Sequence, residues 1–366
     1  MRDARLLLAT LRLAPSADRD ALVDAWSRTD AGPLVRLAAF EGVELWLSRR
    51  LKTLDISLEG EPRRQLDLLA RRAVAQSMRV DAEASAALGA LADAGIPAVP
   101  LKGTALRCIA ARVPYADARA SADVDVLVTA DAARRAWDVL TARGYTSLRE
   151  AGPADGHHLP ALVGSTGVAV ELHITTMATV TPAEAWRRAT SDHAGADRDA
   201  VARPIPSDTE LLWHAVAHAL LDAEDAARIG VRLRYWLDAA ALIGSGSELD
   251  WQRIRARLDS AETPRPTFAR AWLLAAAWLS GRPLPDEALG RQPTTPFDLE
   301  RLVAWRLRVF AGAAPDGRWA VKLVEEGARG EAGLPAEPSP DGASALARVR
   351  HAVAARAARL WWTLRR

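Results

Sequence analysis

Two acidic residues separated by a single valine are the first candidates for chemistry in this chain. Asp123 and Asp125 stand in the run Asp-Val-Asp-Val-Leu-Val of residues 123–128. Successive side chains of a β-strand point to opposite faces, so both carboxylates would share one face while the valines enter a core. Neighbouring like charges repel each other, and a divalent cation relieves that repulsion because hard oxygen ligands suit Mg²⁺.

A third acid supports this interpretation, because an isolated Asp-x-Asp pair is most often a solvated strand end. Glu171 stands in a second apolar run, where Val170 and Leu172 alternate with Glu171 and His173. Three carboxylates on adjacent strands would form a two-metal site, which holds the attacking and leaving oxygens of an in-line phosphoryl transfer. His173 would share the face of Glu171 and is a candidate neighbour of this site.

A short turn upstream of the acids has the composition of a phosphate-binding turn. Lys102, Gly103 and Thr104 follow an apolar strand candidate over residues 98–101 and begin a helical pattern. Glycine lets the backbone approach a phosphate, and the amides of a following helix attract an anion. Lys102 offers a charge to phosphate oxygens, and the Thr104 hydroxyl could cap the helix or contact phosphate. The alternative is an ordinary strand-to-helix turn with a solvated lysine.

These candidates lie in a β-containing segment between two helical segments. Helical periodicity is strong from residue 71 to residue 91, and Gly95 followed by Pro97 is a typical helix end. Short apolar runs then alternate with helical patterns, which indicates an α/β unit. The predicted organisation is a helical region over residues 1–94, an α/β core over 95–203, a helical domain over 204–330, a flexible linker over 331–343 and a basic helix over 344–366.

The composition is that of a globular protein without a strong charge bias. Hydrophobic residues make up 49% and charged residues 26%, and the net charge of +2 argues against a nucleic-acid partner. The single cysteine, Cys108, excludes an internal disulfide. No apolar run approaches the ~18 residues of a membrane span, and the N-terminus lacks a signal-peptide pattern. We therefore expect a cytoplasmic protein.

Four histidines outside the acid-bearing runs have two interpretations each. His214 and His218 are spaced to share one helix face, but a zinc protease requires a glutamate where Ala215 stands. We interpret them as structural or substrate-facing rather than as zinc ligands. His157 and His158 lie in a loop bounded by glycine and proline, where they either face the site or are solvated.

Together these motifs resemble the uncharacterised bacterial nucleotidyltransferase family, which belongs to the polymerase-beta-like superfamily. The resemblance covers about residues 20–245. It differs from better-characterised members in one feature, because Lys-Gly-Thr stands where they have a Gly-Ser turn. The similar segments are residues 33–51, 100–106, Tyr115, Arg119, 123–128, 170–173, 211–218 and 234–238.

The resemblance implies an α+β fold, in which a small mixed-sheet nucleotidyltransferase core is inserted between an N-terminal helical segment and a C-terminal helical domain. It also implies transfer of a nucleoside monophosphate from an NTP to a hydroxyl or phosphate of a small molecule, peptide or protein. The alternative is a catalytically silent binding module that acts as a partner protein in a complex. The basic residues of the C-terminal helix also allow peripheral membrane or protein contacts, although a solvated helix that packs its own apolar stripe is the preferred interpretation.

The resemblance also implies roles for individual residues. Asp123 and Asp125 would hold two Mg²⁺ ions, and Glu171 would complete the site and assist deprotonation of the acceptor. Arg119 would either bind the triphosphate or act as a charge partner of the carboxylates. Ser121 is a further candidate neighbour. The triphosphate-binding set implied in this way is Lys102, Gly103, Thr104 and Arg119.

Overall fold

The computed structural model describes residues 1–14, 18–147, 157–177, 179–191, 204–224, 232–263, 265–290 and 299–310. In these ranges the helices before the first strand are α1 (Arg2–Leu11), α2 (Arg19–Ser27), α3 (Ala31–Glu41), α4 (Glu44–Thr53) and α5 (Gly60–Asp93). The strands are β1 (Ala98–Pro100), β2 (Asp123–Val128), β3 (Thr146–Ser147), β4 (Leu162–Val163) and β5 (Ala169–His173). The remaining helices are α6 (Lys102–Cys108), the 3₁₀ helix η1 (Pro114–Ala118), α7 (Ala133–Ala142), α8 (Pro182–Ser191), α9 (Asp208–Glu224), α10 (Leu233–Gly244), α11 (Trp251–Leu258), α12 (Pro266–Ser280) and α13 (Leu299–Phe310).

The described strands form one mixed sheet in the order β1-β2-β5-β4-β3. Strands β2 and β5 are parallel neighbours, whereas β1–β2, β5–β4 and β4–β3 are antiparallel pairs. The parallel pair lies inside the sheet, with a partner on each side. The acid-bearing strands predicted from the sequence are therefore adjacent, and the predicted α+β class with a mixed sheet is confirmed.

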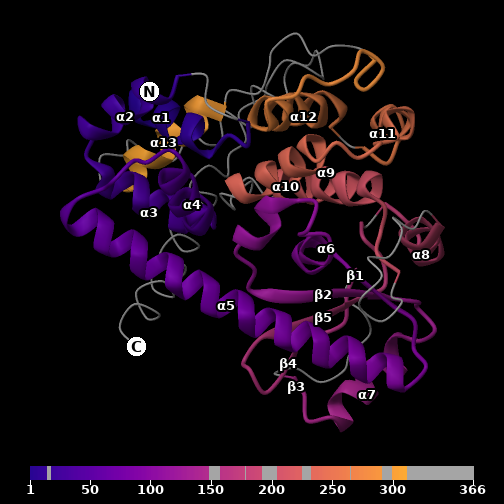
Figure 1. Ribbon diagram of the computed structural model, residues 1–366. Helices are drawn as coiled ribbons and strands as arrows, with labels where there is room; N and C mark the ends of the chain where they lie inside the picture. Colours follow the sequence, from indigo (N-terminus) through magenta and orange to yellow (C-terminus); the bar gives the residue numbers. More distant parts are fainter. Residues whose placement is uncertain are drawn as a thin grey trace, which may run out of the picture.

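One face of this sheet is apolar and covered by helices. Val124, Val126 and Val128 of β2 and Val170 and Leu172 of β5 are buried in a hydrophobic cluster with residues of α5 and α7. Figure 1 shows α5 running along this side of the sheet from the N-terminal helices. The alternation of side chains along β2 and β5 therefore leaves the acids on the opposite face.

The long helix α5 connects the N-terminal helices to the sheet. It spans 34 residues, and it begins at Gly60 rather than near residue 71. Ala94 is its C-cap residue, and Gly95 follows with a φ of 66°, a left-handed conformation that glycine adopts without steric cost. The predicted helix end at this glycine is confirmed.

The helices before and after the sheet share one large hydrophobic cluster, which includes residues of α1–α4 and of α9–α13. Trp236 of α10 and Trp272 of α12 stack within it, with ring centroids 5.7 Å apart. In Figure 1, α13 lies beside the N-terminal helices, and it contacts α1 and α3. Buried Glu41 strengthens this junction, because it accepts hydrogen bonds from Arg306 (2.6 Å) and from the Leu233 backbone amide (2.8 Å). Helices distant in sequence thus hold α9 and α10 over the acid-bearing side of the sheet.

The sheet ends in two short strands, β4 and β3, with two residues each, and the sequence did not predict β4. The predicted linker over 331–343 and the basic helix over 344–366 lie outside the described residues. Within the described ranges, no helix combines the length and apolar character needed to cross a membrane.

Candidate active site

The three predicted acids meet on the sheet face opposite α5. Asp125 of β2 lies directly across from Glu171 of β5 in the parallel ladder, and Asp123 pairs in register with Ala169. Asp125 is 3% exposed, whereas Asp123 and Glu171 are half-buried. The alternation that buries the valines of β2 therefore gathers three carboxylates on one side.

Two basic groups contact Asp125. Lys102 Nζ, at the start of α6, lies 2.6 Å from Asp125 Oδ1, and His173 Nε2 lies 2.8 Å from the same oxygen. His173 Nε2 is also 3.5 Å from Glu171 Oε2. Burial opposes the charge of Asp125, but Lys102 and His173 outweigh burial and hold the pKa of this carboxyl well below its ordinary value. Asp125 is therefore ionised at neutral pH.

The other two acids have different electrostatic surroundings. Burial, together with the negative charge of Asp125, raises the pKa of Asp123. The hydrogen bond with His173 lowers the pKa of Glu171, although burial acts in the opposite direction. Asp123 is thus the acid whose negative charge is least compensated by the protein, and a nearby cation would favour its ionised form.

The donor atoms at this position fit a divalent cation. Asp125, Glu171 and His173 each offer one ligand atom, and these atoms all lie within 4.8 Å of one another. Carboxylate oxygens are ligands for Mg²⁺ and Mn²⁺, and an imidazole nitrogen is a ligand for transition metals. Together with the poorly compensated charge of Asp123, this donor set is suited to hold a cation.

The turn between β1 and α6 is shaped by the side chains packed on it. Lys102 has a φ of 47°, an unfavourable conformation for a lysine, and its ion pair with Asp125 ties it in place. A Cβ on Gly103 would clash with Arg119 Nη1 and Ser121 Oγ. Glycine is consequently required here by the packing of the protein's own side chains.

The expected capping role of Thr104 is wrong. Helix α6 begins at Lys102 with Leu101 as its N-cap residue, and no side chain caps it. Thr104 therefore lies inside the first turn, beyond the position from which a hydroxyl caps a helix. Its Oγ1 is buried and has no hydrogen-bond partner in the described part of the chain.

Arg119 does not act as a charge partner of Asp123 or Asp125. Its Nε donates to both carboxylate oxygens of Asp238 on α10, at 2.8 and 2.9 Å, and its Nη1 donates to Ser121 Oγ at 2.6 Å. Both side chains of the ion pair are 6% exposed. Asp238 was not assigned a role from the sequence, although it ends the Arg-Tyr-Trp-Leu-Asp motif that contributed to the resemblance.

The two loop histidines lie next to the acids. The rings of His157 and His158 are centred 5.5 and 5.4 Å from the ring of His173, and His158 forms a β-bridge with His173. Burial and the neighbouring imidazoles His173 and His158 lower the pKa of His157 to about 4. Of the two interpretations, the one in which these residues face the site agrees with the structure.

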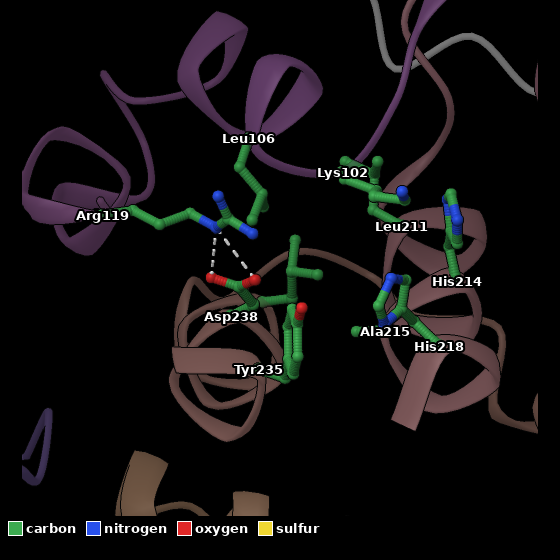
Figure 2. A pocket seen from close by; sticks show the side chains of 10 residues that line it. Lys102, Leu106, Arg119, Leu211, His214, Ala215, His218, Tyr235 and Asp238 are labelled. Carbon is green, nitrogen blue, oxygen red and sulfur yellow. Dashed lines mark hydrogen bonds and ion pairs between the residues drawn. The ribbon is translucent and has the colours of Figure 1, made fainter. Parts of the chain in front are cut away.

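A pocket between α6, α9 and α10 adjoins the acids through Lys102. Figure 2 shows Lys102, His214 and His218 on one side of this pocket and the Arg119–Asp238 pair on the other. Tyr235 and the apolar side chains of Leu106 and Leu211 complete much of its lining. Burial and the Lys102 charge lower the pKa of His214 well below its ordinary value, so this imidazole is neutral. The pocket joins two polar clusters through an apolar lining.

The described fold and site define an α+β protein that gathers carboxylates of two parallel strands on one sheet face, beneath helices. A family model described as uncharacterised nucleotidyltransferase matches residues 27–280, more than half of the chain. The chain belongs to this family, as its motifs predict. No curated protein and no solved structure matches the chain.

Proposed function

We propose that the protein is a Mg²⁺-dependent nucleotidyltransferase that moves a nucleoside monophosphate from an NTP to an acceptor. The observation that carries the proposal is the pairing of Asp125 with Glu171 on adjacent parallel strands, with Asp123 on the same face. Membership of a nucleotidyltransferase family supports it. The carboxylates of Asp125 and Glu171, whose ligand atoms lie within 4.8 Å of each other, with Asp123 on the same face, suit divalent cations, which offset the negative charge of a triphosphate.

In this proposal the residues divide into two groups. Asp123, Asp125 and Glu171 would hold the cations, whose chemistry is to neutralise the charge on the phosphates. Lys102 and Thr104, at the start of α6, would contact the triphosphate. An acceptor oxygen would form a bond to the α-phosphorus while the bond to pyrophosphate breaks, and Glu171 would receive the acceptor proton. Positioning and charge neutralisation would supply most of the rate enhancement.

The small pocket between α6, α9 and α10 has about 20 Å³ of free space, and we propose that a single reacting group of the acceptor enters it. The pocket shares Lys102 with the acid cluster, so a group bound there would lie beside the triphosphate. Neutral His214 can donate one hydrogen bond and accept another, which suits a hydroxyl group. The acceptor class is therefore a hydroxyl or phosphate on a small molecule, or on a peptide or protein side chain that reaches this pocket.

One observation favours a second candidate, a catalytically silent nucleotidyltransferase-like module. Asp125 already has two basic partners within the protein, and the space above Gly103 is filled by Arg119 and Ser121. Such a centre keeps its shape without a nucleotide. The module would then act through its helices as a partner protein in a biosynthetic or regulatory complex.

Labelled nucleotides distinguish the two candidates. The protein is incubated with each α-labelled NTP and Mg²⁺, together with a panel of small hydroxylated and peptide acceptors, and release of pyrophosphate and transfer of label are measured. Asp125→Asn removes one acid of the site. Asp138→Asn is the matched control, because Asp138 is exposed on α7 and pairs with Arg134 of the same helix at 3.0 Å.

The transferase proposal expects pyrophosphate release by the wild type and the Asp138→Asn variant, and a loss of at least about a hundredfold in Asp125→Asn. Equal release by the wild type and Asp125→Asn would sink the proposal. Binding of Mg-NTP without any release across the whole panel would favour the silent module instead.

A further inference from the structure

The cationic side chains beside the acid cluster differ in whether other protein groups already bind them. Lys102 Nζ is 2.6 Å from Asp125 Oδ1. The guanidinium of Arg119 is held by Asp238 and Ser121. A third cation, Arg234 on the first turn of α10, makes no ion pair with a carboxylate in the part of the chain that the structure describes. Its charge is therefore available to an anion from outside the protein.

Neighbouring residues fix the Arg234 side chain without neutralising its charge. Nη2 donates to Tyr235 Oη at 3.0 Å, and the guanidinium carbon lies 4.9 Å from the centre of the Tyr235 ring. Its stem packs on Gly42, where a Cβ would be 3.2 Å from Arg234 Cδ. Its Nε is buried and has no hydrogen-bond partner within the described ranges. A buried donor without a partner costs free energy, which an acceptor atom of a ligand would recover.

Arg234 lies near the segment that leads into β2, the strand that carries Asp123 and Asp125. Asp238 lies four residues further along the helix, one turn away on the same face, and it binds Arg119. Arg119 in turn holds Ser121, two residues before Asp123 at the start of β2. A Cβ at Gly42 would lie 3.2 Å from Arg234 Cδ and 4.0 Å from Ala120 Cβ, so the arginine packs close to the segment that leads into β2. Burial raises the pKa of Glu44, another acid near Arg234, to about 7, so this carboxyl is only partly ionised at neutral pH.

We infer that Arg234 binds a phosphate oxygen of the nucleotide's polyphosphate chain, at a position beside Asp123 that is distinct from the Lys102 end of the site. This inference rests on the proposed function. A planar guanidinium can donate two parallel hydrogen bonds to phosphate, and the Tyr235 ring already orients the group. The sequence signal was present in the Arg-Tyr-Trp-Leu-Asp motif, but the role of its arginine depends on the tertiary neighbours of α10.

The test measures binding of Mg-ATP, Mg-AMP and inorganic tripolyphosphate by calorimetry. Arg234→Gln removes the charge, and Arg234→Lys keeps the charge but not the planar fork. Arg134→Gln is the matched control, because Arg134 is an exposed arginine on α7, across the sheet from the acids. Thermal unfolding of each variant confirms that it is folded.

Arg234→Gln is expected to weaken the binding of Mg-ATP and of tripolyphosphate about tenfold or more, with a change of less than about threefold for Mg-AMP. Arg234→Lys is expected to fall between Arg234→Gln and the wild type, and Arg134→Gln to match the wild type. If Arg234→Gln binds Mg-ATP as tightly as the wild type, while Asp125→Asn loses it, the Arg234 inference is overturned and the proposed function stands. If tripolyphosphate binding depends on Arg234 but no NTP releases pyrophosphate, the inference holds and the transferase proposal fails.

Discussion

Two ion pairs lie on either side of the same pocket, and they differ in exposure. In the Arg119–Asp238 pair both side chains are 6% exposed, and Arg119 also holds Ser121. In the Lys102–Asp125 pair, Lys102 is 19% exposed and Asp125 is shared with His173. This sealed Arg119–Asp238 pair joins α10 to the segment before β2. The Lys102–Asp125 pair is partly exposed through Lys102, so a ligand can replace one of its partners. We therefore assign a structural role to the Arg119–Asp238 pair and a functional role to the Lys102–Asp125 pair.

The largest effect is expected from breaking the sealed pair. Asp238→Ala leaves the Arg119 guanidinium buried without its carboxylate, and the free energy of unfolding should fall by about 3–5 kcal/mol. Urea denaturation measures this change, with Asp138→Ala on the surface of α7 as the control. A loss below about 1 kcal/mol would show that water reaches Arg119, and the two ion pairs would then not differ in their exposure to solvent.

Asp125→Asn should cost less stability than Asp238→Ala, about 2–3 kcal/mol at pH 7, because Lys102 can turn toward solvent. This cost should depend on pH. The folded-state pKa of Asp125 is depressed, so its contribution is complete above the unfolded value of 3.8 and is lost as the pH falls below it. Urea midpoints of the wild type and the variant should therefore converge in acid. A gap that stays constant between pH 7 and pH 3 would contradict the assignment.

Glu44 offers a contrast to the two ion pairs, because it is a buried carboxylate whose Oε2 lacks a hydrogen-bond partner among the described residues. Burial raises its pKa from 4.5 to about 7. The folded state then binds more protons than the unfolded state between these values, so stability falls as the pH rises from 4.5 to 7. Glu44→Gln should be more stable than the wild type by about 2 kcal/mol at pH 8, and equal to it below pH 4.5. Thermal unfolding of both proteins between pH 4.5 and pH 8 measures this difference. Equal stability of the variant and the wild type at pH 8 would contradict the prediction.

The smallest effects come from two helical glycines that differ in what surrounds them. Gly103→Ala would place a Cβ against Arg119 and Ser121, which belong to the sealed pair, and should lose about 1–2 kcal/mol despite the better helix propensity of alanine. A Cβ on Gly89 in α5 would meet no atom within 4 Å beyond the backbone of its own helix, so Gly89→Ala should gain about 0.5–1 kcal/mol. Changes of the same sign at both positions, measured by thermal unfolding, would contradict the packing described for Gly103.

The local parts of this architecture could be predicted from the sequence. The alternation of Asp123 and Asp125 with valines gave the face of β2, and Gly95 gave the end of α5, because both depend on neighbours within a few residues. The two-residue strand β4 is too short to show any periodicity. A helix or strand could thus be predicted from the sequence where its side-chain pattern is long enough to repeat.

The tertiary contacts of the site could not be predicted in this way. Arg119 and Asp238 are 119 residues apart, and no local pattern selects one partner for a buried arginine. Gly103 fits a phosphate turn equally well on sequence, whereas the structure shows which side chains fill its space. The loop position of His157 beside His173 likewise depends on strand pairing. Sequence therefore indicates which residue types could do chemistry, and the fold decides which of them meet.

The central claim is that the acids of β2 and β5 hold cations that bind a nucleotide, and it does not require the acceptor to be known. The most direct measurement is the thermal unfolding temperature with and without saturating Mg-ATP, for the wild type, Asp138→Asn and Asp125→Asn. Ligand at about 100 times its dissociation constant stabilises a protein by about 2.7 kcal/mol. We predict a clear, Mg²⁺-dependent rise for the wild type and Asp138→Asn, and none for Asp125→Asn. An equal rise in all three proteins, or one that persists without Mg²⁺, would contradict the account.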